Sequence, residues 1–228
     1  KVEVPESWKN AEDDAPAAPL AGRDKLHTEF LNDILVPTAN LTADNVPVSK
    51  FLDTVTGMMP AGTAAYEKRG IAADLPHWNV KNCMQCNWCA SVCPHAVVRP
   101  FVMTEEEAAG VADAVPMKGA KDKKFTLGWS LMDCTGCGSC AEVCPARNKA
   151  ITMAPAEEHF MHEAQAKFDK LYQEVDEKET PFKESTVKGA QLKTPLMEFS
   201  GACPGCGETP YAKLVTQLFG DRMFIANA

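Results

Sequence analysis

The sequence lacks three features that would place it at once in a common class. Within its 228 residues no apolar run approaches the length needed to cross a bilayer, and residues 1–14 do not have the basic-then-apolar layout of a signal peptide. Basic residues are in the minority, because 23 Lys and Arg stand against 31 Asp and Glu and leave a formal charge of −8. We therefore expect neither a membrane nor a nucleic acid as a partner, since nucleic-acid binders normally carry a basic face.

Cysteine is absent from residues 1–82 and 145–202, although the chain contains ten cysteines. A disulfide framework would scatter its cysteines through a small secreted chain, and bridges between cysteines three apart would close only tiny loops. This grouping argues against disulfides and predicts a reducing compartment. The ten cysteines are Cys83, Cys86, Cys89, Cys93, Cys134, Cys137, Cys140, Cys144, Cys203 and Cys206.

Eight of these cysteines form an internal repeat. Residues 83–94 read CMQCNWCASVCP and residues 134–145 read CTGCGSCAEVCP, so both follow the pattern C-x2-C-x2-C-x3-C-P. This run is known from bacterial ferredoxins that bind two [4Fe–4S] clusters. The two-residue gaps let one tight loop surround a cubane with three thiolates, while backbone N–H groups turn towards its sulfides.

The fourth cysteine of each run is predicted to serve the other cluster. It follows a three-residue step, about one turn of helix, and the next residue is a proline at which the chain must leave the helix. We assign Cys83, Cys86, Cys89 and Cys144 to one cluster, and Cys134, Cys137, Cys140 and Cys93 to the other. Zinc is the alternative for paired C-x2-C units, but zinc sites rarely use a third cysteine at the same spacing.

The rest of the chain predicts an α+β protein in three parts. Residues 1–58, rich in Ala, Pro and Asp, resemble a linker or wrapping segment with one helix at 24–35 that breaks before Pro37. Residues 59–178 are expected to form a ferredoxin-like domain with an insertion between Cys93 and Cys134, and residues 179–228 a linker and the start of an α/β domain. We expect strands at 96–103, 125–132, 150–153 and 223–226, and helices at 105–114, 156–178 and 210–219.

Two tryptophans and one histidine lie beside the motifs. Trp88 and Trp129 either shield a cluster from water or, as aromatic residues commonly do, simply fill the core. For His95, which directly follows Cys93-Pro94, a hydrogen bond near a cluster and a half-exposed surface position both remain open.

The last two cysteines lie in residues 199–211, FSGACPGCGETPY. A single C-x2-C supplies only two ligands, so either its partners lie beyond residue 228 or the pair is a redox-active dithiol. Together with residues 58–72 (MMPAGTAAYEKRGIA) and 93–100 (CPHAVVRP), residues 199–228 closely resemble the pyruvate:ferredoxin (or flavodoxin) oxidoreductase family. The resemblance covers about residues 45–228 and follows the family's order of linker, inserted ferredoxin domain and thiamine-diphosphate domain.

This resemblance implies a large cytoplasmic homodimer that oxidatively decarboxylates pyruvate with coenzyme A and passes the electrons singly to ferredoxin or flavodoxin. Cys203 and Cys206 would hold half of a third [4Fe–4S] cluster, with the other ligands beyond residue 228. Glu208 would contact thiamine diphosphate, which is bound with Mg²⁺, although it could equally favour the N-terminus of the helix that follows it. Since the chain begins with Lys1 and stops within the apolar run at its end, we expect it to be a piece of a longer polypeptide.

Two other functions stay open. A related 2-oxoacid oxidoreductase would carry the same clusters, because the substrate pocket is not visible in these residues. A stand-alone ferredoxin-type electron carrier would need no further domain, and the stranded pair Cys203 and Cys206 argues against it.

Overall fold

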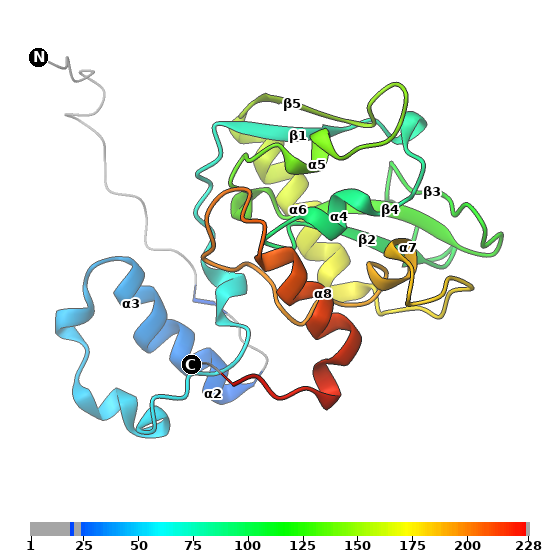
Figure 1. Cartoon of the computed structure of the whole chain (residues 1–228). Coiled ribbons are helices and arrows are strands. Elements are labelled where there is room, and N and C mark those ends of the chain that lie inside the picture. The colour runs from blue at the N-terminus through cyan, green and yellow to red at the C-terminus, as the bar shows by residue number, and fades with distance from the viewer. Residues whose placement is uncertain (1–18, 21–23, 227–228) are drawn as a thin grey trace, which may run out of the picture. The chain divides into compact units, whose positions relative to one another are not determined.

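The computed structural model describes residues 19–20 and 24–226 (Figure 1). The chain divides into two compact units, residues 1–63 and residues 64–228, and each is described by itself. Among the described residues no helix is both long enough and apolar enough to span a bilayer.

The first unit contains a helix that does not break before Pro37, contrary to the sequence prediction. Asp24 caps α2 (Lys25–Phe30) by accepting the His27 N–H at 2.8 Å, and the helix continues through a π turn, η1 (Leu31–Leu35), into α3 (Val36–Ala39). The Val36 N–H bonds to the carbonyl of Leu31, five residues back. This wider turn makes room for the proline ring, which would clash in a regular helix. Two 3₁₀ helices follow, η2 (Ala43–Asn45) and η3 (Val48–Thr54).

The second unit is built from two similar halves that exchange strands (Figure 1). Each half has a strand that ends five residues before a cysteine motif and a second strand that follows the motif. The first strand of one half pairs antiparallel with the second strand of the other, so β1 pairs with β5 and β2 with β4. The short strand β3 then adds to the free edge of β4. The strands are β1 (Asp74–Trp78), β2 (Val98–Met103), β3 (Val115–Pro116), β4 (Lys124–Trp129) and β5 (Ile151–Pro155).

The strands predicted at 96–103, 125–132 and 150–153 correspond to β2, β4 and β5. Their apolar side chains, including the fully buried Phe125 and Leu127, form the main core together with Cys89 and Cys93. Strands β1 and β3 were not expected, because each contains a proline. Proline removes a backbone donor but is tolerated at a sheet edge, and β1 and β3 are both edge strands. The insertion between the motifs therefore forms the three-stranded sheet.

The amphipathic helix predicted at 156–178 is α6 (Glu158–Glu174), which packs on β4. Its Phe168, 1% exposed, meets Phe101 and Phe199 edge-on in a second core cluster. The helix predicted at 105–114 is wrong, because this segment is a series of turns. Thr104 and Glu107 do cap one another reciprocally, but Gly110 at φ +90° ends the turn before a helix can extend.

The C-terminal part contains the short helix α7 (Val187–Ala190) and the predicted helix α8 (Thr209–Phe219). The strand expected at 223–226 is not formed, since these residues have no regular structure and Phe224 and Ile225 are exposed. A strand needs a neighbour to bond its backbone, and none of the described residues pairs with this segment.

Candidate iron–sulfur site

The two cysteine motifs have the same backbone conformation, although their sequences differ. The residue before the second cysteine is left-handed in both, Gln85 at φ +57° and Gly136 at φ +67°, and donates its N–H to the sulfur of the first cysteine at 3.4 Å. The residue after the second cysteine is left-handed as well, Asn87 at φ +64° and Gly138 at φ +77°. Each loop thus directs a backbone N–H at a cysteine sulfur, an arrangement that stabilises a negatively charged cluster.

Gln85 shows how a residue with a side chain tolerates this conformation. Its amide nitrogen donates to the carbonyl of Pro116 at 3.0 Å, and its amide oxygen accepts the Lys118 N–H at 2.7 Å. The insertion between the motifs therefore supports the first cysteine loop directly.

A single helical turn separates the last two cysteines of each motif, as the spacing predicted. In the first motif this turn is α4 (Trp88–Val92), with Cys93 as its extended C-cap, and in the second it is α5 (Ser139–Glu142), followed by Cys144.

The first cavity gathers thiols from both motifs. Cys83, Cys86 and Cys89 line it from the first loop, and Cys144 lines it from the second, while Phe125, Leu127 and Ile151 form an apolar part of its wall. Burial raises the pKa of the Cys89 thiol well above its usual value, and the nearby Cys140, Cys83 and Cys86 add to that rise. Thiols in such a place need a bound cation to exist as thiolates.

The second group of thiols likewise combines three cysteines of one motif with the fourth cysteine of the other. Burial raises the pKa of Cys134 to about 11 and that of Cys140 to about 12, and the neighbouring Cys93 adds to both shifts. Cys137 contributes to the same two shifts. Cys93 therefore lies with the second loop and Cys144 with the first.

The first donor set fits a four-thiolate cluster. In the first set the thiols surround a cavity, and within the part of the chain that the structure describes no three His, Cys, Asp or Glu side chains are placed to hold one metal ion. A [4Fe–4S] cubane accepts four thiolates at the corners of a box and prefers an apolar wall with backbone N–H donors.

The third cysteine pair repeats the same local geometry. Gly205, before the second cysteine of the pair, is left-handed at φ +68°, like Gln85 and Gly136. A Cβ on Gly205 would lie 3.6 Å from Cβ of Cys137, so the C-P-G-C loop packs directly on the second motif. Neither relation was predicted from the sequence, where Cys203 and Cys206 appeared stranded.

Cys206 stands at the N-terminus of α8. Its sulfur accepts the Thr209 hydroxyl at 3.2 Å, and this bond, with the backbone N–H groups of Thr209 and Glu208, lowers the pKa of the thiol. A cysteine so placed favours the thiolate, the form that binds iron. Cys203 and Glu208 are exposed, and Glu208 is the N-cap residue of α8 without a capping bond from its side chain.

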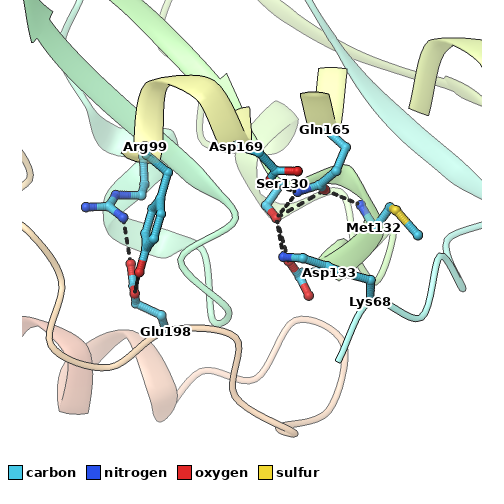
Figure 2. Close-up of polar contacts among 9 residues, drawn as sticks. Lys68, Arg99, Ser130, Met132, Asp133, Gln165, Asp169 and Glu198 are labelled. Carbon is cyan, nitrogen blue, oxygen red and sulfur yellow. Dashed lines mark hydrogen bonds and ion pairs between the residues drawn. The ribbon is translucent and has the colours of Figure 1, made fainter. Parts of the chain in front are cut away.

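Buried polar contacts hold the segment before this pair against the ferredoxin-like halves (Figure 2). Arg99 of β2 donates to Glu198 at 2.7 Å, and the side chains of both are less than a fifth exposed. Tyr172 of α6 donates to the other oxygen of Glu198 at 3.1 Å. Burial raises the pKa of Glu198, and the guanidinium of Arg99 opposes that rise.

Next along the segment, residues 199 and 200 bond to the chain just after Cys93. The Phe199 N–H donates to the carbonyl of His95 at 2.9 Å, and Nδ1 of His95 lies 2.8 Å from the carbonyl oxygen of Ser200. His95 is therefore buried, 3% exposed, rather than half-exposed. Its Nε2 has no partner among the described residues, and the residue lines one cavity with Cys203.

A second polar network anchors the start of the second motif (Figure 2). Asp133, directly before Cys134, bonds to both Lys68 and Ser130, and Gln165 of α6 accepts the Met132 N–H at 3.0 Å. Of the two tryptophans, Trp129 is buried in the core beside Cys89 and Cys93, whereas Trp88 is 45% exposed.

Comparison with known proteins agrees with this geometry. Residues 79–148 match the model of a 4Fe–4S dicluster domain, and residues 21–72 match EKR, a domain of unknown function. The whole chain is 48% identical to part of a pyruvate:ferredoxin oxidoreductase from Moorella thermoacetica and 46% identical to part of a pyruvate-flavodoxin oxidoreductase from Enterobacter agglomerans. It is also 40% identical to part of the mitochondrial pyruvate dehydrogenase [NADP(+)] of Euglena gracilis.

These alignments cover all of this chain but only 19% of the first two relatives and 12% of the third. The chain thus spans about a fifth of the length of the bacterial relatives, and its dicluster domain binds two 4Fe–4S clusters. The duplicated motifs, the strand exchange and the similarity along the whole of this chain lead to one assignment: the chain corresponds to a segment of pyruvate:ferredoxin/flavodoxin oxidoreductases, about 19% of their length, that contains the EKR and dicluster domains.

Proposed function

We propose that the chain relays electrons one at a time through clusters bound by exchanged ligands. Cys83, Cys86 and Cys89 with Cys144 hold one cluster, and Cys134, Cys137 and Cys140 with Cys93 hold the other. The observation that carries this assignment is the first cavity, where thiols of both motifs meet. Cys93 helps to raise the pKa values of Cys134 and Cys140, which supports the second set.

The positions of the three cysteine groups support an order of electron transfer. We infer that Cys203 and Cys206 hold part of a third [4Fe–4S] cluster together with residues beyond 228. The loop of this pair packs on Cys137, so its electrons pass first to the second motif's cluster. Cys140, a proposed ligand of that cluster, helps to raise the pKa of Cys89, a proposed ligand of the other, which supports electron transfer between these two clusters as the next step.

The proposed activity of the whole protein follows from its relatives. It is the oxidative decarboxylation of pyruvate with coenzyme A to acetyl-CoA and CO₂ in a cytoplasmic homodimer, with ferredoxin or flavodoxin as the acceptor. Thiamine diphosphate with Mg²⁺ supplies the decarboxylation chemistry when bound. This chain contributes Glu208 as a contact to that cofactor, residues 1–58 as a linker, residues 59–178 as the cluster domain and residues 179–228 as the start of the cofactor domain.

Metal analysis and EPR test the relay. The complete protein, prepared without oxygen, is expected to contain about twelve iron atoms per chain and to show the broadened EPR signal of interacting clusters after reduction. Replacing Cys203 and Cys206 by serine should reduce the iron to about eight and stop pyruvate-dependent reduction of the acceptor. Zinc in place of iron would overturn the proposal.

The exchange of ligands is tested by a matched pair of variants. Cys144→Ala should remove the EPR signal of the cluster held by Cys83, Cys86 and Cys89, and Cys93→Ala should remove the other signal. The signals are assigned beforehand with Cys86→Ala and Cys137→Ala. If Cys144→Ala instead has the same spectrum as Cys137→Ala, each motif binds its own cluster and the exchange is wrong.

A further inference from the structure

Two lysines donate hydrogen bonds to equivalent backbone carbonyls in the two halves of the repeat. The Nζ of Lys149 donates to the carbonyls of Ala141 and Cys144 at 3.1 and 3.0 Å, and to that of Glu142 at 2.7 Å. In the first motif the matching residues are Ala90, after the third cysteine, and Cys93, the fourth. Their carbonyls accept hydrogen bonds from Lys213, at 3.1 Å for Cys93.

The two lysines differ in origin and in exposure. Lys149 follows its own motif by five residues and is exposed, whereas Lys213 comes from α8, 120 residues beyond Cys93, and is 2% exposed. Figure 1 shows α8 alongside α4, and the two helices are in contact. Among the described residues no ion pair joins Lys213 to a carboxylate, and its Nζ donates instead to the carbonyls at the end of α4.

The end of α4 lies between the two proposed clusters. Cys89 within this turn is a ligand of one cluster, and Cys93 at its end is a ligand of the other. Burial lowers the pKa of Lys213, and negative charge on Cys93 and Cys89 opposes that shift. Both clusters are negative when held by four thiolates, and each gains one further negative charge on reduction. A buried cation next to their ligands stabilises the reduced state more than the oxidised state.

We propose that Lys213 is a positioning residue of the relay, which raises the reduction potentials of both clusters through a buried positive charge at the end of α4. The proposal rests on the exchanged ligand assignment above. Under this proposal a residue of α8, outside the dicluster domain, helps to determine the reduction potentials of the clusters in that domain. Lys149, its counterpart, has a weaker effect, because solvent and salt screen an exposed charge.

The experiment is an EPR-monitored redox titration of the complete, cluster-loaded protein and its variants. Lys213→Met removes the charge and the donor, Lys213→Gln removes the charge but keeps a donor to the carbonyls, and Lys213→Arg keeps the charge. Lys149→Met is the matched control at the equivalent exposed position. Iron content is measured for each variant first, so that loss of a cluster is recognised separately from a change in its potential. The ligand assignment itself is tested independently by the EPR spectra of Cys144→Ala and Cys93→Ala described above.

We expect Lys213→Met and Lys213→Gln to lower the potentials of both clusters, and Lys213→Arg to restore them towards the wild-type values. The shift should be larger than that of Lys149→Met and should persist at high salt, where the shift of Lys149→Met shrinks. Unchanged potentials in Lys213→Gln with full iron content overturn the proposal and leave Lys213 as a helix cap alone. If Lys213→Met fails to retain its clusters, Lys213→Gln decides, because its amide still bonds to the end of α4.

Discussion

Gly136, in the second cysteine loop, offers a sharp test of the repeated loop conformation. Its φ of +67° is costly for any residue with a Cβ, and a Cβ there would lie 3.0 Å from the carbonyl oxygen of Asp74 and 3.4 Å from Cβ of Ala72. Left-handed strain costs Ala about 1–2 kcal/mol. Overpacking against the backbone of β1 adds about 1–3 kcal/mol. Gly136→Ala should therefore destabilise the loop by about 2–5 kcal/mol.

Gly138, two residues further on, is the matched control. Its φ is +77°, but no heavy atom lies within 4 Å of a Cβ at this position. Gly138→Ala should therefore cost only the backbone strain, about 1–2 kcal/mol.

The assay is the denaturant concentration at which half of the visible cluster absorbance is lost, measured without oxygen on both variants and the wild type. We expect a clear order, with wild type most resistant, Gly138→Ala intermediate and Gly136→Ala least resistant. Equal midpoints for the two variants would show that the contact of the added Cβ with the Asp74 carbonyl of β1 does not change the stability of the loop. A lower midpoint for Gly138→Ala would refute the comparison of the two glycines altogether.

Three further predictions concern the contacts around this core. Phe168→Ala should lower the free energy of unfolding by about 3–5 kcal/mol, because it opens a cavity in the aromatic cluster, and calorimetry checks this loss. Arg99→Met should cost about 3–5 kcal/mol by leaving the Glu198 carboxylate buried without its cation, and the double variant with Glu198→Gln should recover most of it in denaturant melts. Burial acts to raise the pKa of Glu107, but its bonds with Lys178 and Thr104 outweigh burial and hold that pKa below 4.5. The ionised form is therefore favoured on folding, so the stability it contributes is present above pH 4.5 and is lost as pH falls through the folded pKa. Melting temperatures of wild type and Glu107→Gln should accordingly converge below pH 4.5, and a constant difference would contradict the shift.

The sequence predicts the two-cluster motifs, most of the strands and the amphipathic helix, because each of these features follows from the spacing or periodicity of residues close together in the chain. The helix predicted at 105–114 fails for the opposite reason. The reciprocal cap of Thr104 and Glu107 is a correct local signal, but the left-handed Gly110 stops the helix after one turn. Strand β1 is not predicted because its proline argues against a strand, whereas the edge strand forms by pairing with the distant β5.

The supporting contacts of the site are harder to predict than its ligands. Lys213 meets the end of α4 across 120 or more residues of sequence, and Arg99 meets Glu198 across 99. A single lysine on an amphipathic helix has no local sign that it is buried, since most lysines at such positions are exposed. The left-handed conformation of Gly205 could have been predicted, because residues 203–206 (CPGC) have a glycine at the same position as residues 134–137 (CTGC).

The strand exchange also fixes when the domain can mature on the ribosome. Residues 74–78 remain without their partner strand until residues 151–155 have been made, and under the proposed exchange of ligands the first cysteine loop also lacks its fourth ligand for much of that interval. A nascent chain halted between the two motifs would therefore expose four thiols and an unpaired strand edge at once, the two features most open to oxidation and to aggregation. Prompt synthesis of the second half therefore protects the first half from oxidation and aggregation.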